Sequence, residues 1–301
     1  MNEDQNIQSN VIDAENSVQA GDVARREFVA LSVTAGLAAT AASAEAAGLE
    51  VVETNVDIKT PDGTCDAAFI RPKKGSHPGV LLWPDAFGLR PVTREMAKRL
   101  AAEGYSVLVP NPFYRVSKAP FTDASKFDFG NPTDRAKLTP LMASVNAPGA
   151  AEKDAAAYVA FLDAQKEVDK KKKIGTQGYC MGGPLIMKTA AALPNRIGAA
   201  ASFHGGGLVT NGPDSPHLLA PKIKAKMYFG VAKNDDEQQP DAKVKLAEAL
   251  KAAGVKAEVE VYGSQHGWCM RDMPAGNGPI YNQADAEKAW AKLLALYKAA
   301  L

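Results

Sequence analysis

Short apolar, β-branched runs alternate with longer stretches of helix-forming residues from residue 51 onward. This alternation is typical of strands joined by crossover helices in a mostly parallel sheet. The predicted strands are residues 51–58, 67–71, 79–83, 106–109, 173–176, 198–203, 225–231 and 257–262. The predicted helices, rich in Ala, Leu, Lys and Glu, are residues 92–103, 150–166, 182–193, 241–253 and 285–300. The pattern predicts one α/β domain over residues 49–301, with about eight strands and helices on both faces.

The first 48 residues follow a different pattern. They begin polar and acidic, and then Arg25 and Arg26 precede a weakly apolar run over residues 28–42. That run is too short to span a bilayer, and the small residues 42–44 suit a signal peptidase. The segment resembles a twin-arginine signal, which predicts export to the periplasm and cleavage near residues 44–47. A frayed N-terminal helix on a cytoplasmic protein is the alternative that the sequence leaves open.

The composition narrows the class of partner. Apolar residues make up 46% of the chain, enough for one large core. The 35 Lys and Arg nearly balance the 34 Asp and Glu, so we expect a neutral small molecule as partner rather than nucleic acid or a membrane. Three cysteines make no disulfide framework, and no CxxC or histidine-rich cluster suggests zinc. We therefore expect no cofactor and no metal, in a monomer or small homo-oligomer.

Candidate chemistry begins with a cysteine between two glycines. Residues 173–183 read as a strand, a sharp turn and a helix start, with Cys180 at the centre of a GxCxG pattern. This is the pattern of a nucleophile elbow in which sulfur replaces oxygen, and Gly178 and Gly182 permit its tight turn. The helix N-terminus favours a thiolate at Cys180, and the Met181 N–H is a candidate oxyanion donor. The alternative is a buried structural cysteine before a glycine-rich turn.

An acid and a histidine each follow a later predicted strand. Asp235 and Asp236 come after residues 225–231, and His266 lies in a glycine-flanked loop after residues 257–262. The order Cys, acid, His is that of an α/β-hydrolase, whose ligands bind at the carboxyl edge of the sheet. We prefer Asp235 as the residue that orients His266 because it comes first after the strand. The sequence does not exclude Asp236, and His266 as an ordinary loop histidine is the alternative reading.

Several stretches together carry a resemblance to a known family. They are residues 83–89 (WPDAFGL), 178–183 (GYCMGG), 203–206 (FHGG), 232–235 (AKND) and 266–268 (HGW). With them the chain resembles the dienelactone hydrolases, or carboxymethylenebutenolidases, from about residue 51 to 301. The resemblance implies an α/β-hydrolase fold and a triad of Cys180, Asp235 and His266 that opens a lactone or activated ester through a thioester.

The resemblance also implies roles around the triad. Asp85 takes the position of a family glutamate that contacts the resting thiol, and the Ala86 N–H would complete the oxyanion hole. Two arginines hold the substrate carboxylate in the family; here the candidates are Arg271 together with Arg135 or Arg115. His204 and Trp268 are further candidates to line the substrate pocket.

Two other functions stay open. One is a general carboxylesterase that uses the same triad on acyclic esters. The other is a non-catalytic exported protein that binds ligands or uses Cys180 only for oxidation. For such a protein in an oxidising periplasm, the sequence predicts a disulfide between Cys180 and Cys269.

Overall fold

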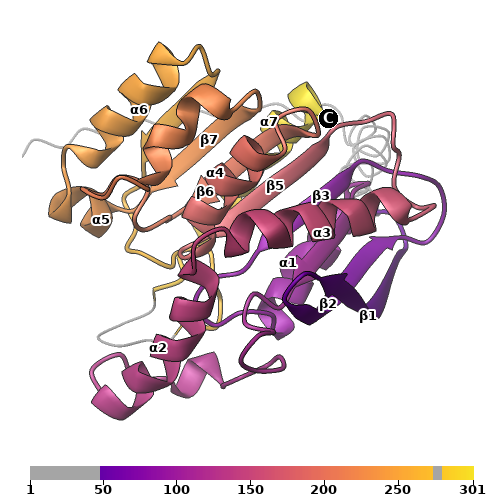
Figure 1. Cartoon of the computed structure of the whole chain (residues 1–301), viewed down its shortest axis with the longest axis horizontal. Coiled ribbons are helices and arrows are strands. Elements are labelled where there is room, and N and C mark those ends of the chain that lie inside the picture. Colours follow the sequence, from indigo (N-terminus) through magenta and orange to yellow (C-terminus); the bar gives the residue numbers. More distant parts are fainter. Residues whose placement is uncertain (1–47, 274–279) are drawn as a thin grey trace, which may run out of the picture. The chain divides into compact units, whose positions relative to one another are not determined.

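Eight strands form a single sheet in the order β1-β2-β4-β3-β5-β6-β7-β8 (Figure 1). Their bounds are β1 Val51–Thr60, β2 Gly63–Pro72, β3 Gly79–Trp83, β4 Ser106–Pro110, β5 Ile174–Tyr179, β6 Ile197–Phe203, β7 Lys226–Val231 and β8 Ala257–Val261. β2 runs antiparallel to both of its neighbours, β1 and β4, whereas β3 to β8 pair in parallel. This topology confirms the predicted mostly parallel sheet of about eight strands.

The computed structural model describes residues 48–273 and 280–301 of the chain. Residues from Gly48 onward form one compact unit. The predicted signal segment, with its paired arginines and its cleavage region, lies outside the described residues. Within the described ranges, no helix combines the length and the apolar character that a membrane crossing requires.

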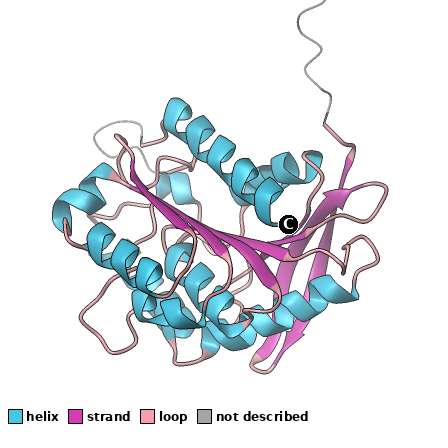
Figure 2. Cartoon of the chain, turned by 90° about the horizontal axis from the view of Figure 1, so that it is seen from above, coloured by secondary structure: helices cyan, strands magenta, loops and turns pink. Residues whose placement is uncertain are grey.

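Helices cover both faces of the sheet, as predicted, and Figure 2 shows the twisted strands between two helical layers. The helices are α1 Pro91–Ala102, α2 Pro132–Asn146, α3 Ala150–Ala164, α4 Gly182–Ala192, α5 Lys233–Gln238, α6 Ala242–Ala252 and α7 Gln283–Ala300, with 3-10 turns at Ala124–Lys126 and Pro216–Lys222. One apolar cluster joins the sheet to α3, α4 and α6, and a second joins its other face to α1 and α7. The sheet is therefore buried on both sides, which explains the nearly continuous apolar runs of β3 and β4.

Two helices have no counterpart in the sequence prediction. α2 contains Pro140 and buries only Leu141 and Val145, so it shows little of the apolar periodicity that marks a helix. The N-terminus of α2 has a common helix cap: the Asn131 side chain accepts a hydrogen bond from the Thr133 N–H, and Pro132 occupies the first turn. α5 is a six-residue, polar helix with no buried residue. Neither helix contributes the periodic apolar face on which a prediction from sequence depends.

The parallel strands bring the chemically interesting loops to one edge of the sheet. β3, β5, β6, β7 and β8 run in the same direction, so their carboxyl ends lie along the same side. The residues that follow these ends are Asp85, Cys180, His204, Asp235 and His266, respectively. This edge is where open α/β sheets bind ligands.

Candidate active site

Cys180 sits on a strained turn between β5 and α4. Its φ is +53°, a left-handed value that non-glycine residues adopt at a cost. A Cβ on Gly178 would lie 2.1 Å from the carbonyl oxygen of Gly182, and a Cβ on Gly182 would lie 2.6 Å from that of Trp83. Both glycines are thus required by close backbone approach. The geometry is that of a nucleophile elbow.

The loop after β6 holds this turn in place. The Cys180 N–H donates to the Phe203 carbonyl oxygen over 3.1 Å, and the Cys180 carbonyl accepts from the N–H groups of Gly183 at 3.0 Å and Gly206 at 3.3 Å. These hydrogen bonds satisfy both the backbone N–H and the backbone carbonyl group of Cys180. Because the backbone is so constrained, the position of the sulfur is set by one side-chain torsion.

His266 and Asp235 form a short hydrogen bond beside the elbow. His266 Nδ1 lies 2.7 Å from Asp235 Oδ2. The backbone N–H of His266 donates to Asn234 Oδ1 over 2.7 Å, which ties the histidine loop to the start of α5. Asp236 is engaged elsewhere, since both of its oxygens accept from Lys243 Nζ at 2.6 and 2.7 Å. Of the two acids that the sequence leaves open, Asp235 is therefore the one that contacts His266.

The protonated, positively charged form of His266 is strongly favoured over the neutral form. Burial alone would lower the pKa of His266, but its side-chain hydrogen bonds with Asp235 and Cys180 and the charges of both partners outweigh burial and raise the pKa to about 10. His266 therefore lies between the Asp235 carboxylate, to which it is hydrogen bonded, and the Cys180 thiol, which also acts on its pKa. At neutral pH the imidazole therefore carries its second proton and a positive charge.

Two backbone donors are free at the same edge. The N–H groups of Met181 and Ala86 donate to no acceptor within residues 48–273 and 280–301. Met181 caps α4, whose N-terminus adds a partial positive charge. The loop after β3 lies against the elbow, because a Cβ on Gly182 would lie 2.6 Å from the carbonyl oxygen of Trp83 and 3.0 Å from that of Pro84. Free N–H groups on these two loops are suited to bind a developing oxyanion.

Asp85 is held by an arginine that the sequence analysis missed. Its oxygens accept from Arg90 Nη1 at 2.6 Å and Nη2 at 2.9 Å, and Oδ1 also accepts from the Phe87 N–H. A buried carboxylate requires such a cationic partner. The predicted contact of Asp85 with the resting thiol is not supported by this placement, because Arg90 occupies the carboxylate.

The predicted pocket residues His204 and Trp268 are both fully buried. The His204 ring makes edge contacts with the rings of His266 and Trp268, each at a centroid distance of 5.0 Å. Burial, followed by the charge of His266, holds the pKa of His204 well below its ordinary value. The His204 ring thus packs directly against His266, and Trp268 packs behind His204. The complete burial of both side chains does not support direct contact with substrate.

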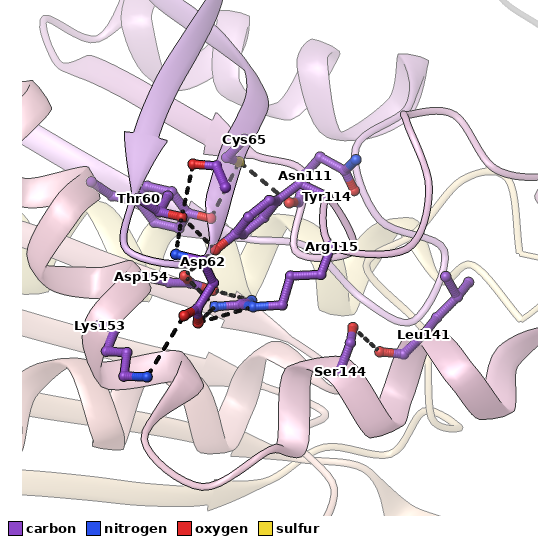
Figure 3. Close-up of polar contacts among 12 residues, drawn as sticks. Thr60, Asp62, Cys65, Asn111, Tyr114, Arg115, Leu141, Ser144, Lys153 and Asp154 are labelled. Carbon is purple, nitrogen blue, oxygen red and sulfur yellow. Dashed lines mark hydrogen bonds and ion pairs between the residues drawn. The ribbon is translucent and has the colours of Figure 1, made fainter.

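No described contact joins any of the three candidate arginines to Cys180. Arg271 is exposed and packs over the Tyr281 ring at 5.5 Å, and Arg135 is exposed on α2. Arg115 pairs with Asp154 and Asp62, in the network that joins the β1–β2 turn to α3 (Figure 3). Arg115 is thus a structural residue, and no described contact assigns substrate binding to Arg271 or Arg135.

The other two thiols differ from Cys180 in their surroundings. Burial raises the pKa of Cys65 to about 12, and burial also raises the pKa of Cys269 well above its ordinary value. Cys269 packs with the α1 and α7 cluster, whereas Cys180 packs with the opposite cluster, and all three thiols are free. Among the described residues, no group of three or more His, Cys, Asp or Glu side chains is arranged to hold a metal ion.

The fold and the carboxyl-edge arrangement define an α/β-hydrolase. The family model of the dienelactone hydrolases matches residues 65–301, and the chain belongs to this family. It is therefore a hydrolase of esters or lactones. The resemblance found in the sequence motifs is confirmed.

Individual relatives match most of this chain. The carboxymethylenebutenolidase of Rhodococcus opacus is 25% identical over 230 residues, which cover 74% of this chain and 82% of that protein. Protein usf of Aquifex pyrophilus is 28% identical over 236 residues, covering 76% and 91%. A dienelactone hydrolase-like promiscuous phosphotriesterase from metagenomic libraries superposes with a TM-score of 0.68 at 22% identity, covering 83% of this chain and 99% of that structure. The last likeness shows the shared fold.

Proposed function

We propose that the protein hydrolyses a lactone or an activated carboxylic ester with a catalytic triad of Cys180, His266 and Asp235 and a thioester acyl-enzyme. The observation that carries this proposal is the strained elbow of Cys180 beside His266, whose Nδ1 lies 2.7 Å from Asp235 Oδ2, at the carboxyl edge of the sheet. A relative named carboxymethylenebutenolidase supports the choice of a lactone.

In the first half-reaction the proton of Cys180 rests on His266, whose pKa is raised to about 10. The thiolate attacks the lactone carbonyl carbon and forms a C–S bond, while the carbonyl oxygen becomes an oxyanion that accepts from the Met181 and Ala86 N–H groups. When this intermediate collapses, the ring C–O bond breaks and the leaving oxygen takes the proton from His266. Asp235 keeps the imidazole in the required orientation throughout.

In the second half-reaction a water molecule displaces the Cys180 sulfur from the acyl group. Neutral His266 removes a proton from a water molecule, which attacks the thioester carbonyl, and the same two N–H groups bind the oxyanion. The C–S bond then breaks and releases the opened hydroxy acid or its enol. Cys180 leaves as a thiolate with the proton on His266, so the resting state is restored.

The nucleophile favours particular substrates. A thiolate is a better leaving group than an alkoxide, so an intermediate formed on a simple alkyl ester returns mainly to substrate. Lactones with an enol oxygen and aryl esters release a stabilised oxygen and proceed to the thioester. We therefore expect strained or enol lactones to be better substrates than alkyl esters.

A comparison of kcat/KM separates this proposal from a general carboxylesterase. The substrates are dienelactone, a simple butenolide, p-nitrophenyl acetate and ethyl acetate. We expect the enol lactone to be preferred and ethyl acetate to be a poor substrate. A preference for the acyclic esters over both lactones would support the carboxylesterase, and no hydrolysis of any of the four would contradict the proposal.

A further inference from the structure

Arg90 is buried between two carboxylates that belong to different loops. Its guanidinium donates to Asp85 through Nη1 and Nη2, at 2.6 and 2.9 Å, and to Asp272 through Nε and Nη2, at 2.7 and 2.9 Å. The Arg90 side chain is 2% exposed, that of Asp85 is 3% exposed and that of Asp272 is 29% exposed. Two edges of one planar group are thus fixed by paired hydrogen bonds, which determines its orientation completely.

Each carboxylate anchors a loop of the active site. Asp85 directly precedes Ala86, and its backbone and side chain also accept from the N–H groups of Gly88 and Phe87. Asp272 lies at the end of consecutive turns that begin beside His266, in which Trp268 N–H donates to Gln265 and Met270 N–H donates to Gly267. One guanidinium therefore connects the loop of the free Ala86 N–H to the loop of His266.

Arg90 is itself held rigidly. It is the N-cap of α1, where its N–H donates to Thr93 Oγ1 at 3.1 Å and its carbonyl accepts from that hydroxyl at 2.9 Å. Thr93 is fully buried, and the guanidinium also packs over the Phe87 ring at 5.4 Å. Arg90 thus links these two loops to a helix that packs on the sheet.

We infer that Arg90 is a positioning residue of the active site, which sets the Ala86 N–H against the Cys180 and His266 pair. This inference rests on the proposed thioester mechanism. An oxyanion donor acts only at a defined position, and small displacements of such groups slow the reaction steeply. The clamp makes no contact with Cys180, so it acts on the intermediate rather than on the thiol.

The test compares two reactions of the same sulfur. The burst of p-nitrophenolate from p-nitrophenyl acetate measures thioester formation, which needs the oxyanion donors. Alkylation of Cys180 by iodoacetamide is a displacement at a saturated carbon, which forms no oxyanion. The variants are Asp272→Asn, which weakens the partly exposed half of the clamp, and Arg90→Lys. The control is Arg94→Gln on α1, which breaks the ion pair of Arg94 with Glu53 on β1.

We expect thioester formation to slow by at least about 10-fold in Asp272→Asn, and by more in Arg90→Lys, since loss of an oxyanion donor costs about 10²- to 10³-fold. Alkylation, normalised to the folded fraction, should change by less than about 2-fold, and Arg94→Gln should change neither rate. A parallel fall of both rates, or an unchanged burst in folded Asp272→Asn, would overturn the inference. If wild type formed no thioester, the proposed function would fail as well, so the two failures are distinguishable.

Discussion

Asp235 contacts His266 from the first turn of α5, while the adjacent Asp236 points to Lys243 on α6. Neighbouring carboxylates in one short helix therefore have separate partners. The Asn234 side chain, which accepts from the backbone N–H of His266, adds a second link between α5 and the histidine loop. The short helix is thus the element that selects the orienting acid.

The two acids provide a matched pair of variants. Asp235→Asn removes the charge that stabilises the His266 imidazolium and permits the wrong tautomer, so kcat should fall by about 10³- to 10⁴-fold. Asp236→Asn breaks only a partly exposed pair with Lys243 and should leave kcat within about 2-fold. Steady-state hydrolysis of a lactone measures both. Equal losses in the two variants would argue against Asp235 as the orienter.

The pH dependence of thiol reactivity follows from the raised pKa of His266. Because that pKa is about 10, His266 keeps its positive charge through neutral pH, and in the proposed mechanism this charge accompanies the nucleophilic sulfur. Alkylation of Cys180 by iodoacetamide should then be nearly independent of pH between about 7 and 9. In Asp235→Asn one cause of the raised pKa is gone, so the rate should climb with pH around an ordinary thiol value of ~8.5. A wild-type profile that climbs in the same way would contradict the ion pair.

The same shift predicts how stability depends on pH. A histidine whose folded pKa is raised contributes stability that is fully present below its unfolded value of about 6.5. That contribution is lost as pH rises through the folded value of about 10. The difference in unfolding free energy between wild type and Asp235→Asn should therefore shrink from pH 6 to pH 10. Urea unfolding at several pH values measures it, and a difference that grows over this interval would have the wrong sign.

The elbow glycine offers a test of the backbone geometry. A methyl group on Gly178 would lie 2.1 Å from the Gly182 carbonyl oxygen, whereas one on Gly263 would meet nothing within 4 Å. Overpacking of this kind costs about 1–3 kcal/mol, and we expect Gly178→Ala to fall at the upper end because the obstacle is backbone. Gly263→Ala should unfold within about 0.5 kcal/mol of wild type in urea. Similar midpoints for both variants would disprove the close approach.

Export stays a prediction that a fractionation experiment can test. Expressed in its own host, the chain should appear in the periplasm with a mass that starts near residues 44–47. Replacing Arg25 and Arg26 by lysines should retain the uncleaved chain in the cytoplasm. Uncleaved wild-type protein in the cytoplasmic fraction would contradict the signal.

The sequence predicts the sheet well because its strands are short apolar runs buried on both faces. Every predicted strand is present, with ends that differ by a few residues. α2 and α5 were missed because Pro140 and a wholly polar composition hide any helical periodicity. Local pattern is thus a reliable guide only where an element buries an apolar face.

Within the site, residues that a local sequence motif marks could be predicted, whereas a residue defined by a distant contact could not. The turn at Cys180 has its own glycines, and Asp235 and His266 follow strands, so the chain itself points to them. Arg90 shows no such pattern, because its partner Asp272 lies 182 residues away and only the tertiary fold brings them together. Arg115 illustrates the converse, since an arginine chosen by alignment to a family has its charge satisfied by Asp154.

The central claim is that Cys180 forms a covalent acyl-enzyme. The most direct measurement is intact-protein mass spectrometry of wild type and Cys180→Ala, quenched in acid during turnover of dienelactone or p-nitrophenyl acetate, with peptide mapping of any adduct. We predict a mass increase equal to the acyl group, located on Cys180 and absent from Cys180→Ala, together with loss of turnover in that variant. Turnover by Cys180→Ala at the wild-type rate, or an adduct on another residue, would contradict the mechanism.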